Sequence, residues 1–159
     1  MNIRPAIFTI ALLATCTCAQ ALELPTGALP VSANRIVGLW DTQVIAGPCH
    51  SGITTFRGRG LNVFHAGGTV SATNNLPPTA NGPTYGVWVY RGHGDYRARM
   101  QFFRYLPDGS FDGVQDIHRS MLLSGDGQRT DETTNVRVLN ADGSLRVELC
   151  GAAIAQRVR

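Results

Sequence analysis

Five polar side chains occupy positions that strand alternation assigns to an otherwise apolar face: Arg104, Gln115, Arg119, Glu132 and Thr134. Arg119 is expected opposite Thr134 and diagonal to Glu132, within reach of a long side chain. One interpretation is a buried ion pair that holds the fold together through additional hydrogen bonds. The other is a binding site, in which the planar donor fork of Arg119 anchors a polar or anionic ligand group.

Aromatic side chains share this predicted inner face. Trp40, Trp88, Tyr90, Tyr96 and Phe102 would form the wall of the interior. Buried aromatic rings serve packing more often than ligand binding, so both roles stay open. The candidate ligand-binding residues are therefore Trp88, Tyr90, Phe102, Gln115, Arg119 and Glu132.

No motif of the sequence indicates a metal site or a known catalytic arrangement. The histidines do not occur at ligand spacings such as i, i+2 or i, i+4, and only His65 is placed where it could point inward. There is also no nucleophile elbow, phosphate-binding loop or paired-carboxylate motif. We expect no metal and no cofactor, and the sequence names no catalytic residue.

Composition limits the class of protein. The 159 residues suffice for one ordinary domain, with 43% hydrophobic and 16% charged residues, which excludes a disordered chain. All 14 basic residues are arginine, and the net charge of +3 comes from interspersed signs, so no nucleic-acid footprint is present. No apolar run is long enough for a membrane-spanning helix.

The first 21 residues have the layout of a secretory signal peptide. Arg4 precedes an apolar run at 6–15, and Ala19-Gln20-Ala21 supplies small residues for cleavage after Ala21. A lipoprotein anchored through Cys16 is not expected, because Thr15 before the cysteine fits poorly. The sequence therefore predicts an exported protein, periplasmic or extracellular, with an extended lead-in at 22–36 and a single domain at 37–159.

Cleavage would remove two of the four cysteines and leave Cys49 and Cys150. In an oxidising compartment this pair is expected to form a disulfide between the end of the first strand and the last strand. A reactive cysteine pair is the alternative, although the wide spacing does not resemble a redox motif.

The rest of the chain reads as short strands joined by turns, with no helical periodicity. The expected strands are 37–46, 53–65, 69–74, 85–91, 95–106, 111–123, 129–139 and 145–157. Three Asp-Gly pairs, starting at Asp108, Asp126 and Asp142, are predicted centres of two-residue hairpins. Gly92-His93-Gly94 is expected to form a three-residue loop.

These turns fix a register in which paired residues share a face throughout 95–157. Phe102 should oppose Gln115, and Met100 should oppose Ile117. One face collects apolar residues, including Phe111 and Leu145, and the other collects polar ones. An all-β, eight-stranded antiparallel up-and-down barrel follows, because closure removes exposed strand edges.

Gly38-Leu39-Trp40 at the start of the first strand resembles the Gly-x-Trp motif of lipocalins. In that family the tryptophan closes the barrel floor beneath an arginine near the chain end, a position that Arg157 or Arg159 could fill. The resemblance implies a lipocalin-like barrel with a cavity for a small apolar molecule.

Three function classes are open. The first is a secreted barrel that binds a small, largely apolar molecule, which needs a cavity of about 300 Å³ or more for a typical ligand. The second is a barrel enzyme, an isomerase or cyclase of the allene-oxide-cyclase type, which would be favoured if Glu132 lay apart from Arg119. The third is an envelope interaction protein with a packed interior. The sequence does not give the oligomeric state.

Overall fold

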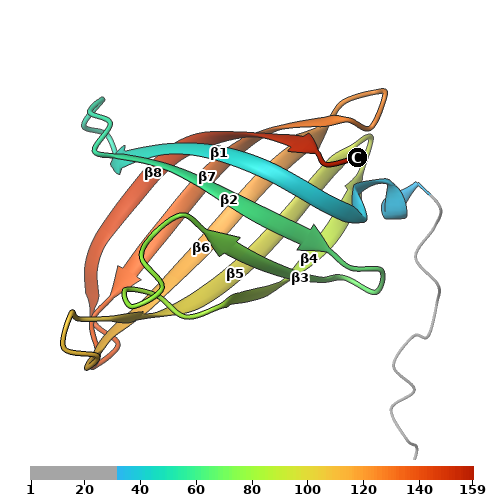
Figure 1. Cartoon of the computed structure of the whole chain (residues 1–159). Helices are drawn as coiled ribbons and strands as arrows, with labels where there is room; N and C mark the ends of the chain where they lie inside the picture. Colours follow the sequence, from blue (N-terminus) through green and yellow to red (C-terminus); the bar gives the residue numbers. More distant parts are fainter. Residues whose placement is uncertain (1–31) are drawn as a thin grey trace, which may run out of the picture.

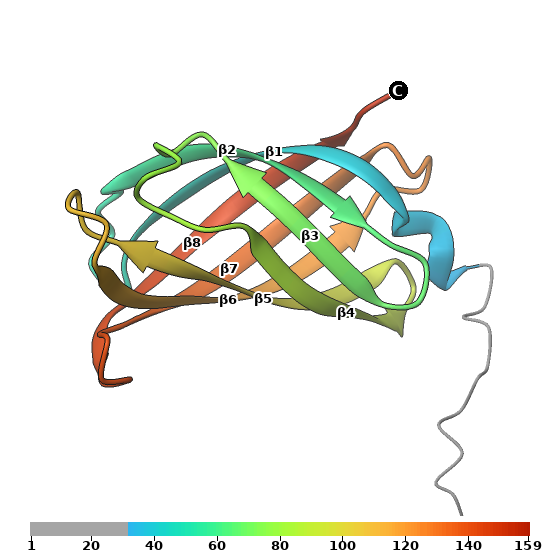
Figure 2. The ribbon, with the colours of Figure 1, turned by 60° about the horizontal axis from the view of Figure 1, so that its bottom comes forward.

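The structure, a computed structural model, describes residues 32–159 as one closed antiparallel barrel of eight strands (Figures 1 and 2). Each strand pairs with its sequence neighbours, and the first strand pairs with the last, which confirms the up-and-down barrel. The strands are β1 (Gly38–Pro48), β2 (Phe56–Phe64), β3 (Thr69–Asn74), β4 (Thr84–Gly92), β5 (Asp95–Tyr105), β6 (Phe111–Leu123), β7 (Arg129–Leu139) and β8 (Leu145–Arg157). The predicted signal peptide, 1–21, lies outside the described residues. No helix among 32–159 is long and apolar enough to cross a membrane.

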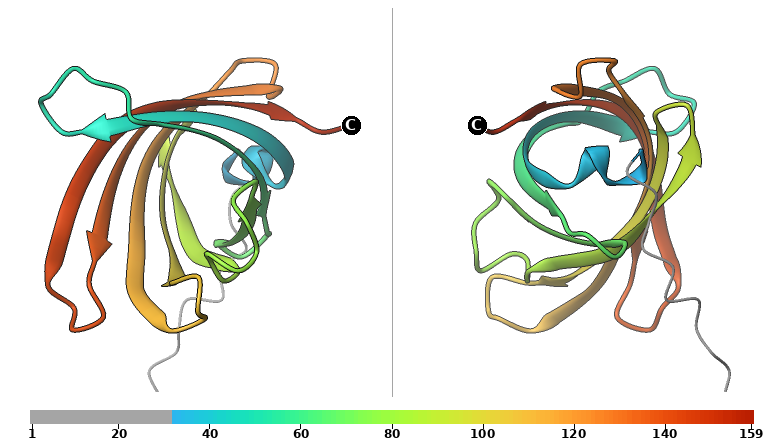
Figure 3. Two further views of the ribbon diagram at one scale, coloured as in Figure 1. Left: turned by 60° about the vertical axis from the view of Figure 1, so that its left-hand side comes forward. Right: turned by 90° about the vertical axis from the view of Figure 1, so that its right-hand side faces the viewer.

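The lead-in expected to be extended at 22–36 ends instead in a 3₁₀ helix, η1 (Ala33–Ile36). The remainder of that range, up to residue 31, lies outside the described part of the chain. η1 lies across one end of the barrel, as the right-hand view of Figure 3 shows. Ala33 and Ile36 are fully buried there, so this short helix acts as a plug at what we call the closed end.

The predicted register is confirmed across the second half of the barrel. Met100 pairs with Ile117, Ile117 with Val136, and Val136 with Leu149. Because paired residues share a face, this single chain of contacts carries one apolar row around four strands. A shift of one residue at any hairpin would have placed the row outside.

The Asp-Gly turns differ from the predicted type while preserving the register. In each of the three, the glycine adopts a positive φ of 74–84°, whereas the aspartate does not. The aspartate carboxylate instead accepts the backbone N–H two residues later, at 2.9–3.0 Å in all three turns. This Asx-type contact stabilises the turn from the side chain, so two left-handed residues are not needed.

Bulges reconcile two of these three turns, those of the β5–β6 and β7–β8 hairpins, with the strand pairing, and the β6–β7 hairpin has none. In the β5–β6 hairpin the Leu106 N–H donates to the Ser110 carbonyl, one residue out of the predicted register. A register shift between Arg104 and Tyr105 absorbs the extra residue. The β4–β5 hairpin shows the reverse: His93 and Gly94 both have positive φ and form a two-residue turn, and a bulge beside Gly92 restores the predicted pairing.

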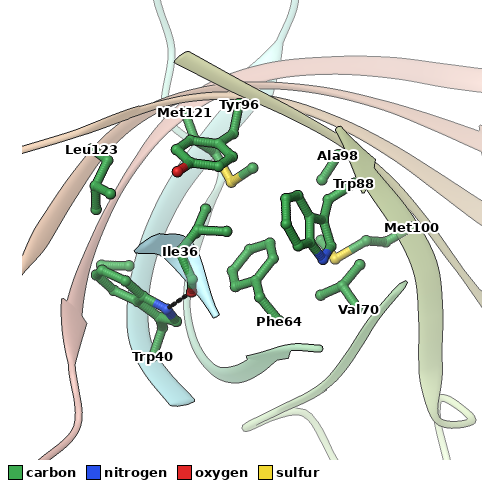
Figure 4. Packing of buried hydrophobic residues seen from close by; sticks show 11 residues of the cluster. Ile36, Trp40, Phe64, Val70, Trp88, Tyr96, Ala98, Met100, Met121 and Leu123 are labelled. Carbon is green, nitrogen blue, oxygen red and sulfur yellow. Dashed lines mark hydrogen bonds between the residues drawn. The ribbon is translucent and has the colours of Figure 1, made fainter. Parts of the chain in front are cut away.

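Large apolar side chains fill the closed end (Figure 4). The Trp40 indole N–H donates to the Ile36 carbonyl at 2.8 Å, which fixes the plug to the first strand. The buried members of this cluster are Ile36, Trp40, Phe64, Val70, Trp88, Tyr96, Ala98, Met100, Met121, Leu123 and Ala155.

Arg157 seals the closed end from outside the cluster. Its guanidinium lies 4.4 Å from the centre of the Trp40 ring, directly across the β1–β8 pair. It also donates to the carbonyls of Val37 and Gly127, at 2.8 and 2.9 Å, and to that of Arg35. The contact between tryptophan and a late arginine that the lipocalin resemblance implied is therefore present, through Arg157.

We expect Arg157→Ala to lower the free energy of unfolding by about 2–4 kcal/mol, because a cation–π contact and charge-assisted hydrogen bonds disappear together. Urea unfolding followed by tryptophan fluorescence measures this loss. Arg159→Ala, which removes an exposed arginine two residues later, is the matched control and should change stability little. Equal effects of the two substitutions would contradict the sealing role.

The opposite end of the β1–β8 pair is held covalently. Cys49 and Cys150 form the predicted disulfide, which joins residues 101 positions apart. Cys49 directly follows the last β1–β8 pair, Pro48 with Leu149, and Cys150 pairs with Gly47. The seam that closes the barrel is thus fixed by Arg157 at one end and by the disulfide at the other.

Candidate functional site

A cavity of about 180 Å³ occupies the half of the barrel opposite the plug, and we call this the open end. It lies between the strand ends that lead into the β1–β2, β3–β4, β5–β6 and β7–β8 loops, which gather at one side in Figure 1. Its apolar wall comes from seven strands: Val44, Ala46, Phe56, Ala72, Met100, Phe102, Ile117, Val136 and Leu149. Such a wall favours an apolar occupant.

Polar side chains gather in the deeper part of the cavity, next to the apolar plug. The Asn62 amide donates to the Thr42 hydroxyl at 2.5 Å, and both residues are buried. Thr84, Arg119 and Thr134 are buried members of the same lining. We call these five residues the polar floor; buried polar groups need hydrogen-bond partners, so a ligand entering here would meet donors and acceptors.

Arg119 and Glu132 form an ion pair inside the barrel, as their predicted diagonal positions indicated. Their side chains are 6% and 2% exposed. Thr130 donates its hydroxyl to one carboxylate oxygen of Glu132 at 2.6 Å. The other oxygen contacts Arg119 without an aligned hydrogen bond. Arg119 faces the cavity, while Glu132 lies behind it, outside the lining.

The structure divides the predicted ligand-binding residues between the two ends. Phe102, Gln115 and Arg119 line the cavity. Trp88 and Tyr90 belong to the packed end: the Trp88 indole donates to the His65 carbonyl, and both rings pack against Tyr96, at 5.8 and 5.0 Å. Trp88 and Tyr90 do not line the cavity, because the plug η1 fills the end of the barrel in which they lie.

Three other expectations about the inner face also change. Arg104 lies at the rim of the open end, where it pairs with Asp112 instead of facing the cavity. His65 is exposed and contacts the Ser71 hydroxyl at 2.8 Å, so it does not point inward. Phe111 and Leu145, expected on the inner face, are 45% and 51% exposed. The bulges in the β5–β6 and β7–β8 pairs place them opposite Tyr105 and Leu139, on the outer face.

Sequence reasoning missed the first-half residues of the floor, Thr42, Asn62 and Thr84. Alternation from the inward Trp40 would have assigned Thr42 to the interior, and Asn62 pairs directly with Trp40. The β1–β2 register that reveals this pairing is not readable from the sequence, because the 49–55 loop lacks an Asp-Gly centre.

Two glycines of β2 keep the mouth of the cavity open. Gly58 and Gly60 line the cavity, and both sit in regular pairing with β1, without a bulge. A Cβ at Gly60 would lie 2.8 Å from the Thr73 carbonyl oxygen. Glycine is therefore required there by the close approach of β3.

On the outer face of β6, Asp116 is 2% exposed although it points away from the cavity. Arg99 covers it and donates two hydrogen bonds, at 3.0 and 2.9 Å, and His118 lies 3.4 Å away. Burial raises the pKa of Asp116, but hydrogen bonds from Arg99, Gln101 and His118 outweigh it, so the net pKa lies below the ordinary 3.8.

This lowered pKa predicts acid sensitivity. The ionised carboxylate stabilises the fold above the unfolded-chain pKa of 3.8, and that stabilisation is lost as pH falls through the lower, folded-state pKa. We expect the free energy of unfolding of Asp116→Asn to decrease less steeply than that of the wild type as the pH falls below 3.8. Urea unfolding at a series of acidic pH values tests this, and an unchanged slope in the variant would contradict it.

No family model and no curated protein matches this sequence. Among solved structures, one similar chain is the S-type phycobiliprotein lyase CPES from Guillardia theta, with 9% identity and a TM-score of 0.39. The match covers 79% of this chain and 90% of that one. The likeness concerns the arrangement of strands, and the chemistry of the cavity has to be argued from its own residues.

Proposed function

We propose that this protein is an exported, lipocalin-like barrel that binds a small, largely apolar molecule in its open half. The observation that carries the proposal is the cavity itself, which has apolar walls from seven strands above a polar floor. A pocket that is mostly apolar, with a few convergent polar groups, is the usual form of a small-molecule site.

The volume of the cavity limits the size of the ligand that it can enclose. About 180 Å³ is less than the 300 Å³ or more expected for a typical ligand. The ligand is therefore smaller than most lipocalin-type cargo, or only its buried end fits while the remainder extends through the mouth. The apolar Leu76 lines that mouth and is 37% exposed, so a protruding chain would still meet an apolar surface.

The pairing of Glu132 supports binding over the enzyme alternative. A general base of an isomerase or cyclase has to reach its substrate. Glu132 lies behind Arg119 and outside the cavity lining, held by Arg119 and Thr130. The interaction-protein alternative expected a packed interior, and the open half of this barrel contains a cavity instead.

Filling the cavity should abolish binding. Val44→Phe places a larger ring in the open half, where Val44 lines the cavity. A ligand at a hundred times its Kd should stabilise the wild type by about 2.7 kcal/mol. We expect a corresponding rise in Tm with small alcohols, amides or aromatic probes, and no rise in Val44→Phe.

Ile45→Phe is the matched control, because Ile45 is the next residue and is 41% exposed on the outer face. It should bind as the wild type does. If no probe of the panel shifts the Tm of the wild type, or if both variants bind equally, the proposed site is wrong.

A further inference from the structure

The charge in the deep end of the cavity is balanced before any ligand arrives. Among the described residues that line the cavity, the ionisable ones are Arg59 and Arg119. Arg59 is 65% exposed and engages Asp41 on the outer face, where its Nε donates at 2.8 Å. Arg119 is neutralised inside by Glu132. The polar floor, taken together with Glu132 behind it, therefore offers polar atoms and has a net charge of zero.

An anionic ligand group would disturb this balance. A carboxylate brought to Arg119 would have to share the guanidinium with Glu132, and three buried charges would then sum to minus one. An uncompensated charge in a water-poor interior is costly, because the lost hydration is not replaced. Two carboxylates at one site also disfavour each other's ionised form.

Binding a neutral polar group does not carry the energetic cost of an uncompensated buried charge. Arg119 presents several N–H donors in one plane and accepts nothing, so a hydroxyl or carbonyl oxygen can accept from it beside Glu132. The buried hydroxyls of Thr42, Thr84 and Thr134 and the amide of Asn62 can both donate and accept. A hydroxyl or primary amide would find complementary partners among these groups.

We infer that the Arg119–Glu132 pair makes the cavity select apolar molecules that end in a neutral polar group, such as an alcohol or an amide, over the corresponding carboxylates. Glu132 is then the specificity-determining residue, although it does not line the cavity. This inference rests on the proposed function and names the chemical class of its ligand.

The test compares three ligands with the same chain: 1-octanol, octanamide and octanoate. Titration calorimetry with the wild-type protein is run at a pH of about 8, where octanoate is ionised. We expect octanol and octanamide to bind at least about tenfold more tightly than octanoate. Octanoate binding as tightly as the neutral ligands, or more tightly, would overturn the inference and leave the proposed function standing. Binding of none of the three would contradict the proposed function itself.

Glu132→Gln should reverse the preference, because the variant keeps the shape of the side chain and leaves Arg119 free to pair with a carboxylate. We expect octanoate to gain at least about tenfold in affinity relative to octanamide. Asp116→Asn is the control: it removes one negative charge from a neighbouring strand, on the outer face, and should leave the selectivity unchanged.

The double variant Arg119→Met/Glu132→Leu covers the case in which Glu132→Gln does not fold, since apolar replacement of a buried pair is generally tolerated. Octanamide should then lose about tenfold in affinity, because its main donor has gone. Unchanged octanamide binding would show that the polar end of the ligand lies elsewhere, and would overturn the inference.

Discussion

Glu132→Leu is expected to lower the free energy of unfolding by about 3 kcal/mol, because it removes one partner of a buried ion pair. The loss comes from Arg119, whose side chain is 6% exposed and would remain charged without its partner. Thr130 would lose its acceptor as well.

The double variant Arg119→Met/Glu132→Leu separates the penalty of leaving Arg119 unpaired from the net contribution of the ion pair to the free energy of unfolding. We expect it to regain most of the lost stability, since no buried charge remains to be compensated. Urea unfolding of the wild type, the single variant and the double variant provides the comparison. A double variant as unstable as Glu132→Leu would mean that the pair itself stabilises the barrel.

The second large effect concerns the disulfide. Replacing both Cys49 and Cys150 by serine should lower the free energy of unfolding by about 4–5 kcal/mol, because the bridge closes a loop of 101 residues in the unfolded chain. The β1–β8 seam would then be held by its backbone ladder, with Arg157 at the closed end.

Urea unfolding of the oxidised wild type and of the double serine variant measures this difference. The wild type in the presence of a reductant should unfold as the serine variant does, which controls for effects of the serines themselves. A loss below about 1 kcal/mol would show that the unfolded chain is restrained by something other than the bridge.

The second half of the barrel was predictable from sequence because its hairpins are short and its faces differ. Met100, Ile117, Val136 and Leu149 each have at least one polar or charged neighbour, so a shift of one residue would have buried those neighbours. The turn chemistry was not predictable in detail, since an Asp-Gly pair fits more than one turn type. The bulges compensated for that error, and the pairing of the strands survived it.

The candidate site was only half predictable. Arg119 and Glu132 could be brought together by register arithmetic, and the structure places them in contact. The position of Trp88 could not be anticipated, because alternation gives the face of a residue and not its depth along the barrel. Whether a given depth is packed or open depends on which end of the barrel the plug η1 fills. The four residues of η1 have no strand periodicity, so the sequence did not predict the plug.

The ends of the described chain have a consequence for how the molecule could be presented to its surroundings. η1 and the C-terminal end of β8 both lie at the plugged end, and the four loops around the mouth form the opposite end (Figures 1 and 3). A tether joined directly before η1 or after β8 would therefore attach to the barrel on the side away from its mouth. A surface-immobilised or fused form of the protein would keep its cavity accessible without further engineering.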